Sequence, residues 1–437
     1  MKSEFYYFQT RDDKWINQNT VVALTGLMSS GKTKIALDFV KDKKHFYFSF
    51  ANLNESMARL FLSQRIFDDE QFHSWKQIFS KINDIAKFQP IFIFDDIESL
   101  LSDNEFCNAL NDFMNSTIRN RIFMVLIFNQ GANINKLNLA FRCIVSKPIS
   151  IAKIKKATPN WSNQEILELH TLTGGFVPLI KLFDNSVSFK DNLQKLFDKN
   201  SLFVTFAEKM LRSSFRTPES YMMILYAITC GNHRVSEIGK FTGFAYNKCD
   251  KYLGSLMDCG YVIASKVDNK TIYSILNSYL EIWFKYIYPN RNLIEIGTFD
   301  TFFFSDIYPQ FIKTDVENHY REACFKVIRD RLICCVTNAT IEQVRDNPYT
   351  LKTKDIGYTF DCYVAEKSKA VFVKILSDTT EIAGKDMVVE FEEAAAKLNH
   401  LYNSELFICS KRRFSDFAVH EALGGFLKLI TVERLNF

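Results

Sequence analysis

One stretch near the N-terminus constrains the fold of this chain more than any other. The apolar run Val21–Leu24 is followed by Gly26–Thr33, which reads GLMSSGKT and fits the pattern G-x-x-x-x-G-K-[S/T]. Glycines at the fixed positions let the backbone curl so that its N–H groups point inward at phosphates. The lysine of such a loop supplies a charge for the β- and γ-phosphates, and the hydroxyl of its last residue reaches Mg²⁺.

An amphipathic helix follows this loop directly, over residues 32–40, and its positive N-terminal end favours a bound anion. The strand that leads in and the helix that leads out are the context that a phosphate-binding loop requires. A Gly-Ser turn between a strand and a helix is the alternative. The residues predicted to hold ATP are Gly26, Leu27, Met28, Ser29, Ser30, Gly31, Lys32 and Thr33. Thr33 is also predicted as a ligand of Mg²⁺.

The bulk composition describes an ordinary soluble protein. The 437 residues are enough for two to four domains, and 47% of them are hydrophobic against 24% charged. The 54 Lys and Arg against 50 Asp and Glu leave a net charge of +4, which is too weak to predict nucleic-acid binding by itself. The ten cysteines include no C-x-x-C pair, and no N-terminal apolar stretch reaches signal-peptide or membrane length. We therefore expect a cytoplasmic protein with reduced thiols and no membrane partner.

Two adjacent carboxylates follow a predicted buried strand. The apolar run Ile91–Phe94 ends in Asp95 and Asp96, which is the form of a Walker B element. In such an element the first carboxylate holds the Mg²⁺ shell through water, and the second polarises the attacking water. We therefore predict Asp95 as a metal residue and Asp96 as a catalytic residue. A strand that ends in a capped turn is the alternative, since Asp also starts helices.

Further buried strands predict an α/β fold for residues 1–150, with helices on both faces of a parallel sheet. The strand Arg121–Phe128 ends in Asn129, at the place where this class of ATPase carries a γ-phosphate sensor. Asn129 is predicted as that sensor, and an ordinary strand-end turn explains it equally well. Strands are also expected at His45–Phe50 and Ala140–Ser146. A strand between the phosphate-binding loop and the Asp-Asp strand indicates the additional-strand branch of P-loop proteins.

Residues 151–212 carry a helical pattern that resembles a lid, with a stop at Gly174-Gly175 and a restart led by Pro178. Residues 213–290 then predict three helices and a hairpin, which is the order of a winged helix-turn-helix. The third helix carries Lys248 and Lys251 but also Asp250 and Asp258, a poor electrostatic match for DNA. We therefore favour an interaction or coupling module over a DNA reader. The helices are expected at Pro218–Thr229, Val235–Phe241 and Ala245–Cys259, and the hairpin strands at Gly260–Ala264 and Thr271–Ile275, around Asp268-Asn269.

A loop near Pro289–Asp300, within a linker over residues 291–310, is expected to lead to a separate α/β unit over residues 311–437. That unit is predicted to start with a helix and to continue with three strands, a second helix and two more strands. The predicted elements are a helix at Val316–Arg329, strands at Arg331–Val336, Gly357–Val364 and Ala370–Ile375, a helix at Lys385–Leu401, and strands at Leu406–Ser410 and Leu427–Val432.

The order of phosphate-binding loop, Asp-Asp strand, Gly-Gly lid and winged helix is similar to that of the prokaryotic AAA-like ATPases often called the archaeal ATPase family. These are relatives of the signal-transducing STAND NTPases. Residues 273–290, YSILNSYLEIWFKYIYPN, resemble the family's run after its winged helix, where an aromatic pair precedes Pro-Asn. The resemblance covers nearly the whole chain. It implies ATP and Mg²⁺ as cofactors, a contact of Arg142 with a nucleotide on a neighbouring subunit, and a C-terminal domain like a PD-(D/E)xK nuclease.

The chain departs from this family at several motifs. Met28, Ser29 and Ser30 are neutral where the family usually has two basic residues inside the loop, and Asp96 is one carbon shorter than the usual Glu. A shorter side chain weakens the positioning of water, so slow hydrolysis or binding without hydrolysis is expected. The lid is one residue longer than the usual Gly-Gly-x-Pro.

The resemblance to a nuclease implies a metal site that this chain does not complete. Glu317 and Asp361 lie in the elements that carry the first two acids of the motif, and Lys374 is present on the next strand. The third acid is replaced by Phe372, which cannot coordinate a hard cation. We therefore predict a degenerate nuclease-like domain without nuclease activity.

The leading prediction is an ATP-binding, Mg²⁺-dependent P-loop ATPase that couples its nucleotide state to the winged helix and the nuclease-like domain. A nucleotide-binding scaffold without turnover, acting through protein partners or as a homo-oligomer, is the alternative from a different class. A DNA-processing ATPase with nuclease activity is the third reading, although the charge pattern does not support DNA as a partner.

Overall fold

The computed structural model describes residues 21–67, 72–85, 90–115, 123–132, 137, 142–267, 270–332, 344, 348–352, 357–366, 369–377, 382–398 and 404–435. The chain divides into two compact units, each made of two separate stretches. The first unit contains residues 2–148 and 205–277, and the second contains residues 149–204 and 278–437. The predicted lid of residues 151–212 is therefore divided between the units. Residues 278–290, expected at the end of the winged-helix segment, belong to the second unit.

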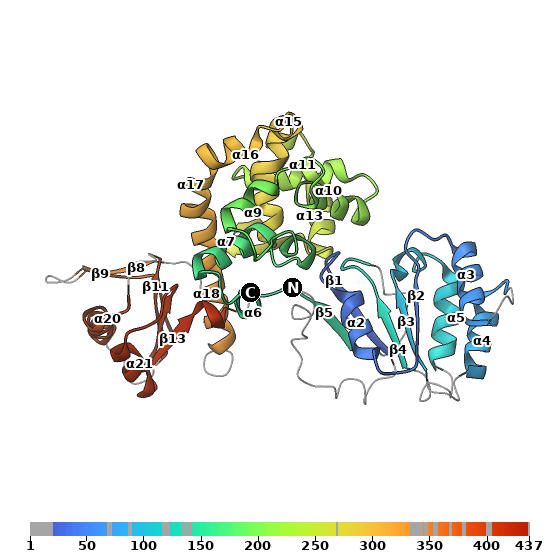
Figure 1. Ribbon diagram of the computed structural model, residues 1–437, viewed down its shortest axis with the longest axis horizontal. Coiled ribbons are helices and arrows are strands. Elements are labelled where there is room, and N and C mark those ends of the chain that lie inside the picture. The colour runs from blue at the N-terminus through green and yellow to red at the C-terminus, as the bar shows by residue number, and fades with distance from the viewer. Residues whose placement is uncertain are drawn as a thin grey trace. The chain divides into compact units, whose positions relative to one another are not determined.

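The first unit contains a five-stranded parallel sheet in the order β2-β3-β4-β1-β5 (Figure 1). Strand β4 lies between β1 and β3, whereas β2, the strand between the glycine loop and the Asp-Asp strand in the sequence, lies at the edge of the sheet. The strands are β1 (Val21–Gly26), β2 (His45–Ser49), β3 (Ile91–Asp95), β4 (Phe123–Ile127) and β5 (Arg142–Ser146). The helices along this stretch are α2 (Lys32–Val40), α3 (Glu55–Phe67), α4 (Trp75–Ile85) and α5 (Asn104–Asn115), with a 3-10 turn η3 (Ile97–Ser99).

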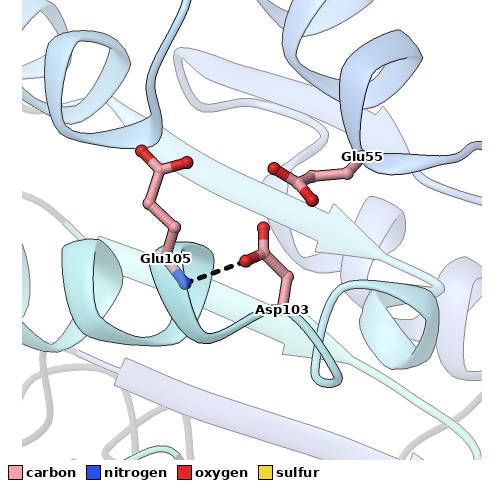
Figure 2. Close-up of side chains that lie close together, drawn as sticks. All are labelled: Glu55, Asp103 and Glu105. Atoms are coloured by element: carbon pink, nitrogen blue, oxygen red, sulfur yellow. Dashed lines mark hydrogen bonds between the residues drawn. The ribbon is translucent and has the colours of Figure 1, made fainter.

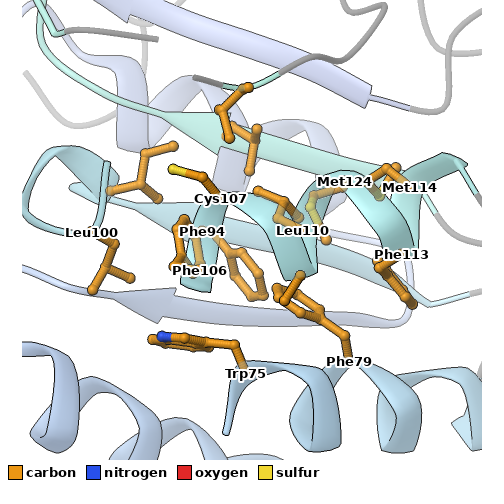
Figure 3. Close-up of a cluster of buried hydrophobic side chains, with 14 of the residues drawn as sticks. Trp75, Phe79, Phe94, Leu100, Phe106, Cys107, Leu110, Phe113, Met114 and Met124 are labelled. Carbon is orange, nitrogen blue, oxygen red and sulfur yellow. The ribbon is translucent and has the colours of Figure 1, made fainter. Parts of the chain in front are cut away.

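Strict alternation along the strands builds a core on each face of this sheet. Phe94 of β3 packs in a cluster with Trp75 of α4 and Phe106 of α5 (Figure 3). Phe92 of the same strand belongs to this cluster too. The other residues of the same strand, such as Ile93, pack on the opposite face with α2. Successive side chains of a strand point to opposite faces, so a strand that is apolar throughout must be covered on both. The carboxyl ends of these strands therefore emerge at one edge of a rigid, two-sided sheet.

The C-terminal stretch of the first unit holds the three helices and the hairpin that the sequence predicts. They are α11 (Pro218–Thr229), α12 (Val235–Thr242), α13 (Tyr246–Asp258), and the antiparallel strands β6 (Val262–Val267) and β7 (Lys270–Ile275). Helix α10 (Leu202–Ser214) precedes them and belongs to this unit from Thr205 onward. Asp268 and Asn269, the predicted turn, lie outside the described residues. Left-handed Gly243 ends α12 and leads into α13, because glycine adopts positive φ without strain.

The second unit begins with the helices α6 (Ile151–Ala157), α7 (Asn163–Thr173), α8 (Val177–Ile180) and α9 (Phe189–Lys195). The loop expected near Pro289–Asp300 was a wrong prediction, because most of this stretch is helical. Phe299 and Phe303 are buried and contact Phe197, the first edge-to-face and the second tilted, with ring centroids 5.0 and 4.5 Å away. Such burial stabilises a helical turn that a short, weakly periodic sequence does not reveal. The segments are α14 (Ser278–Ile282), η6 (Trp283–Ile287), η7 (Tyr288–Asn290), α15 (Arg291–Glu295), α16 (Phe299–Phe302), η8 (Phe303–Ile307), α17 (Tyr308–Gln310) and η9 (Phe311–Val316).

The second unit ends in a four-stranded sheet in the order β10-β11-β12-β13, antiparallel between β10 and β11 and parallel beyond. The strand predicted at Arg331–Val336 is wrong at its start, because Arg331 and Leu332 continue α18; residues 333–336 lie outside the described residues. The strand predicted at Gly357–Val364 is interrupted at Asp361. The elements are α18 (Glu317–Leu332), the pair β8 (Tyr349–Lys352) and β9 (Gly357–Phe360), β10 (Cys362–Glu366), β11 (Lys369–Leu376), α20 (Lys385–Lys397), β12 (Ser404–Ser410), α21 (Asp416–Leu423), β13 (Leu427–Thr431) and η11 (Val432–Arg434).

No helix among the described residues combines the length and the apolar character that a membrane crossing demands.

A buried histidine pair joins two helices of the second unit. Nδ1 of His170 on α7 lies 2.7 Å from Nε2 of His319 on α18, and Nε2 of His170 lies 2.9 Å from the carbonyl oxygen of Ile149. One nitrogen of the pair must donate and the other accept, so the arrangement needs an imidazole acceptor. Burial lowers the pKa of His170 to about 4 and lowers that of His319 well below its usual value.

Acid is therefore expected to destabilise the second unit. The unfolded chain binds a proton at His170 near pH 6.5, whereas the folded chain resists that proton until about pH 4. The stability that depends on neutral His170 is fully present above pH 6.5 and is lost as the pH falls toward 4, by about 2 kcal/mol at pH 5. Denaturant unfolding at pH 7 and pH 5 measures this loss. His319→Gln, which cannot titrate, should lose less than wild type, and an equal loss in both would contradict the prediction.

Candidate functional site: the carboxyl edge of the parallel sheet

The loop between β1 and α2 has the backbone shape of an anion cradle. Gly26 has a φ of +146°, Ser29 a φ of +59°, and Gly31 a φ of +92° at the start of α2. A Cβ on Gly26 would lie 2.3 Å from the carbonyl oxygen of Ser146, so only glycine fits where β1 lies beside β5. Consecutive residues of mixed handedness turn backbone N–H groups to one side, and the N-terminal end of α2 follows directly with its own N–H groups.

Lys32 occupies the centre of the loop as a buried cation. Its ammonium donates to the carbonyl oxygens of Gly26 and Leu27, at 3.2 and 2.9 Å, and to Oδ1 of Asn129, at 2.9 Å. All three acceptors are neutral, and within the described part of the chain no carboxylate forms an ion pair with this ammonium. Burial lowers the pKa of Lys32, while the nearby Glu98, Asp95 and Asp96 oppose that effect. A buried cation bonded only to neutral oxygens fits an anionic ligand such as a phosphate.

Thr33 and Asp95 meet beside Lys32, as the two motifs predict. The hydroxyl of Thr33 donates to Oδ2 of Asp95 at 2.5 Å, and the backbone N–H of Asp96 donates to Oδ1 of Asp95 at 2.9 Å. Burial raises the pKa of Asp95, and the hydrogen bond from Thr33 lowers it. A hydroxyl and a carboxylate in contact are oxygen ligands of the kind that Mg²⁺ takes in phosphate sites. These two residues fit the metal that the loop implies.

The backbone of Asp96 turns the chain away from the direction of β3. Its backbone is left-handed, with φ 56° and ψ 41°, and its Oδ2 accepts a hydrogen bond from the hydroxyl of Ser49 at 2.8 Å. An aspartate tolerates this conformation better than most residues, because its short polar side chain bonds locally. The carboxylate is thus engaged with β2, which constrains its predicted role with water.

Glu98 is a site residue that the sequence did not single out. Its Oε1 accepts a hydrogen bond from the backbone N–H of Asn129, and burial raises its pKa. Since Asn129 also accepts from Lys32, the three residues form a chain of contacts from η3 through β4 to the loop. The signal in the sequence is an acid three residues after Asp95, one turn beyond a buried strand.

The remaining loop residues have structural contacts. The carbonyl oxygen of Ser30 accepts from the hydroxyl of Ser146 at 2.8 Å, which ties the loop to β5. The hydroxyl of Ser213 at the end of α10 lies 3.2 Å from the sulfur of Met28.

Arg142 begins β5, but its side chain lies outside what the structure describes, so its predicted contact with a neighbouring nucleotide stays a prediction.

The acids predicted for the nuclease-like domain are paired with cations. Lys411 forms an ion pair with Glu317 at 2.7 Å, and Arg321 forms one with Asp361 at 2.8 Å. The ammonium of Lys374 instead lies 5.4 Å from the ring centroid of Tyr358. Phe372, two residues earlier on the same strand, is buried in the core with α20. The structure therefore gives these two acids protein cations as partners, and the loss of a metal site stays a prediction.

A further acidic group, Glu55, Asp103 and Glu105, has carboxylate oxygens within 4.8 Å of one another (Figure 2). Arg59 pairs with Glu55 and Glu105, and the two N–H groups of Trp75 donate to Glu105 and Asp103 at 2.9 and 3.0 Å. Asp103 also accepts from the backbone of Glu105. These donors explain the group as a brace between α3, α4 and α5.

Comparisons with known proteins give distant similarities. No family model matches the chain. The uncharacterized protein MJECL04 of Methanocaldococcus jannaschii is 24% identical over 311 residues, and the match covers 65% of this chain and 68% of that protein. The Walker-type ATPase PABY2304 of Pyrococcus abyssi has a TM-score of 0.48 and 16% identity, over 62% of this chain and 92% of that one. The STAND protein PH0952 of Pyrococcus horikoshii, which has a tetratricopeptide repeat sensor, has a TM-score of 0.31 and 16% identity, over 74% of this chain and 49% of that one. At these levels the three proteins assign no function to this chain, so its function has to be inferred from its own site.

Proposed function

We propose that this chain is an ATP-binding, Mg²⁺-dependent P-loop ATPase of the AAA/STAND-like archaeal type. One observation carries the proposal: Lys32 and Thr33 of the glycine loop meet Asn129 and Asp95 at the carboxyl edge of the sheet. In this role the loop N–H groups and Lys32 bind the phosphates, while Thr33 and Asp95 hold Mg²⁺. The bound Mg²⁺ supplies positive charge that favours phosphoryl transfer.

Asp96 and Glu98 have different roles in this proposal. Asp96 takes the role of orienting water, and its bond to Ser49 limits that role until the carboxylate is released. Glu98 holds the backbone of Asn129, so it positions the sensor next to Lys32. Slow hydrolysis follows from this arrangement. The bond of Asp96 to Ser49 also favours the second candidate, a nucleotide-binding scaffold without turnover.

Phosphate release by the purified protein with ATP and Mg²⁺ separates these two functions. We expect slow release by wild type, and a reduction of at least about tenfold in Asp96→Asn, because a positioned base contributes on this scale or more. Asp96→Asn should still bind ATP, and Asp191→Asn, at the start of α9 in the second unit, is the matched control. Release at the wild-type rate by Asp96→Asn would contradict the role of Asp96. ATP binding without any release by wild type would favour the scaffold.

We further propose that nucleotide state reaches α13 through the end of β4. The backbone N–H of Gln130 donates to the carbonyl oxygen of Gly26 at 3.0 Å. A Cβ on Gly131 would lie 2.6 Å from Sγ of Cys259, and a Cβ on Gly260 would lie 2.6 Å from Oε1 of Gln130. Because the chain at Gln130 and Gly131 lies so close to Cys259 and Gly260, a shift of the first pair would move the turn after α13. The winged-helix segment would be the element that reads the nucleotide.

Gly131→Ala tests this coupling, with Gly231→Ala as its control. The two glycines have φ values of +89° and +88°, but only Gly131 has atoms near a new Cβ. Both variants carry the same backbone strain, so their difference reports the contact with Cys259. We expect ATP to change hydrogen exchange over residues 246–275 in wild type and in Gly231→Ala, but not in Gly131→Ala. Unchanged exchange in wild type on saturation with ATP would rule out the coupling.

A further inference from the structure

Two hydroxyl groups of strand β2 contact the acids at the end of β3. Tyr47 and Ser49 are two residues apart, so they lie on the same face of the strand. In the parallel register Ser49 pairs with Asp95. The phenol of Tyr47 donates to Oδ2 of Asp95 at 3.1 Å, and the hydroxyl of Ser49 donates to Oδ2 of Asp96 at 2.8 Å. Each of the two adjacent carboxylates therefore has its own donor on the neighbouring strand.

The contact of Tyr47 completes the surroundings of Asp95. Oδ2 of Asp95 accepts from both Thr33 and Tyr47, and Oδ1 accepts from the backbone of Asp96. Donors on both oxygens fix the rotation of the carboxylate, so its oxygens keep one orientation beside Thr33.

The phenol of Tyr47 is itself suited to remain a donor. Burial raises its pKa above the usual value, and the charge of Asp95 acts in the same direction. Tyr47 therefore stays protonated over the whole working range of pH. It can donate a hydrogen bond to Asp95 without adding a positive charge that would repel a cation.

We infer that Tyr47 is a positioning residue of the metal–nucleotide site, which sets how much Mg²⁺ the site needs by fixing the carboxylate of Asp95 in one rotation beside Thr33. This role rests on the proposed function. Tyr47 does not touch the phosphates in this account, so it should act on the metal-dependent part of binding alone. Loss of its hydroxyl leaves Oδ2 of Asp95 with one donor fewer, so the carboxylate is freer to rotate.

Tyr47→Phe removes only the hydroxyl, and Tyr308→Phe is the matched control. Tyr308 donates to a carboxylate oxygen of Glu168 at 2.7 Å in the second unit, so both variants delete a tyrosine–carboxylate bond. The probe is a fluorescent ATP analogue titrated with Mg²⁺. In Tyr47→Phe we expect the Mg²⁺ concentration for half-maximal binding to rise about fivefold, the factor that corresponds to one hydrogen bond. Affinity in EDTA should stay at the wild-type value, and Tyr308→Phe should match wild type in both.

Only folded protein contributes to the titration midpoint, so a lower melting temperature of Tyr47→Phe does not obscure the result. A wild-type midpoint in Tyr47→Phe would overturn this inference while the proposed function stands. If wild type binds no nucleotide at all, both fail.

Discussion

Gly26→Ala is expected to abolish ATP binding, while Gly31→Ala weakens it. Both glycines have positive φ, where an alanine is strained by roughly 1–3 kcal/mol. At Gly26 the new Cβ would also lie 2.3 Å from the carbonyl oxygen of Ser146 and 3.0 Å from Oγ of Ser30. Among the residues that the structure describes, no neighbouring atom lies within 4 Å of a new Cβ at Gly31. The backbone of Ser146 belongs to β5 and cannot move without breaking the pairing with β1, so the loop has to open.

Equilibrium binding of ATP and the melting temperature of the two variants measure these effects. Gly31→Ala should melt slightly below wild type and bind ATP several-fold more weakly, in keeping with about 1 kcal/mol of strain. Gly26→Ala should melt lower and show no saturable binding. Equal behaviour of the two variants would mean that the contact with β5 does not shape the loop.

Lys32→Ala should remove ATP binding and leave the fold intact. The ammonium is buried and bonded to three neutral oxygens, so its removal takes away a desolvated charge rather than a salt bridge. A phosphate that loses a charge-assisted partner in such a site loses about 3 kcal/mol, or roughly 100-fold in affinity. The neighbouring Asp95, Asp96 and Glu98 then repel the anion without opposition.

The matched control for this variant is Lys34→Ala. Lys34 lies two residues further along α2, is exposed, and pairs with Asp38 one turn away. Exposed pairs of this kind contribute about 0.5 kcal/mol or less to a helix. We expect Lys34→Ala to bind ATP as wild type does. If Lys32→Ala also retains wild-type affinity in equilibrium dialysis, the nucleotide does not bind at this loop.

The sequence predicts the parallel sheet well because its strands are apolar on both faces. Ile91–Asp95 has no polar side chain before its carboxyl end, so the sequence alone predicts a buried strand that ends in an acid. The same holds for β1 and its glycine loop. The pairing of Lys32 with Asn129 and of Thr33 with Asp95 follows from the rule that parallel strands end at one edge.

The contributions of Glu98, Tyr47 and Ser49 could not be predicted in the same way. Tyr47 and Ser49 sit in an aromatic strand whose register against β3 is set only by the packed sheet. Glu98 reaches Asn129 because a left-handed residue at Asp96 turns the chain back. The prediction of a loop in the linker was wrong for a similar reason. Phe299 and Phe303 contact Phe197, which lies about a hundred residues away in the chain, so local sequence patterns do not reveal the contact.

The most direct test of a metal–nucleotide site at Gly26–Thr33 is a calorimetric titration of the wild-type protein with ATP, in Mg²⁺ and again in EDTA. We predict saturable binding of one ATP per chain that is tighter with Mg²⁺ than without it. Absence of binding under both conditions, or binding of the same affinity in both, would contradict the account.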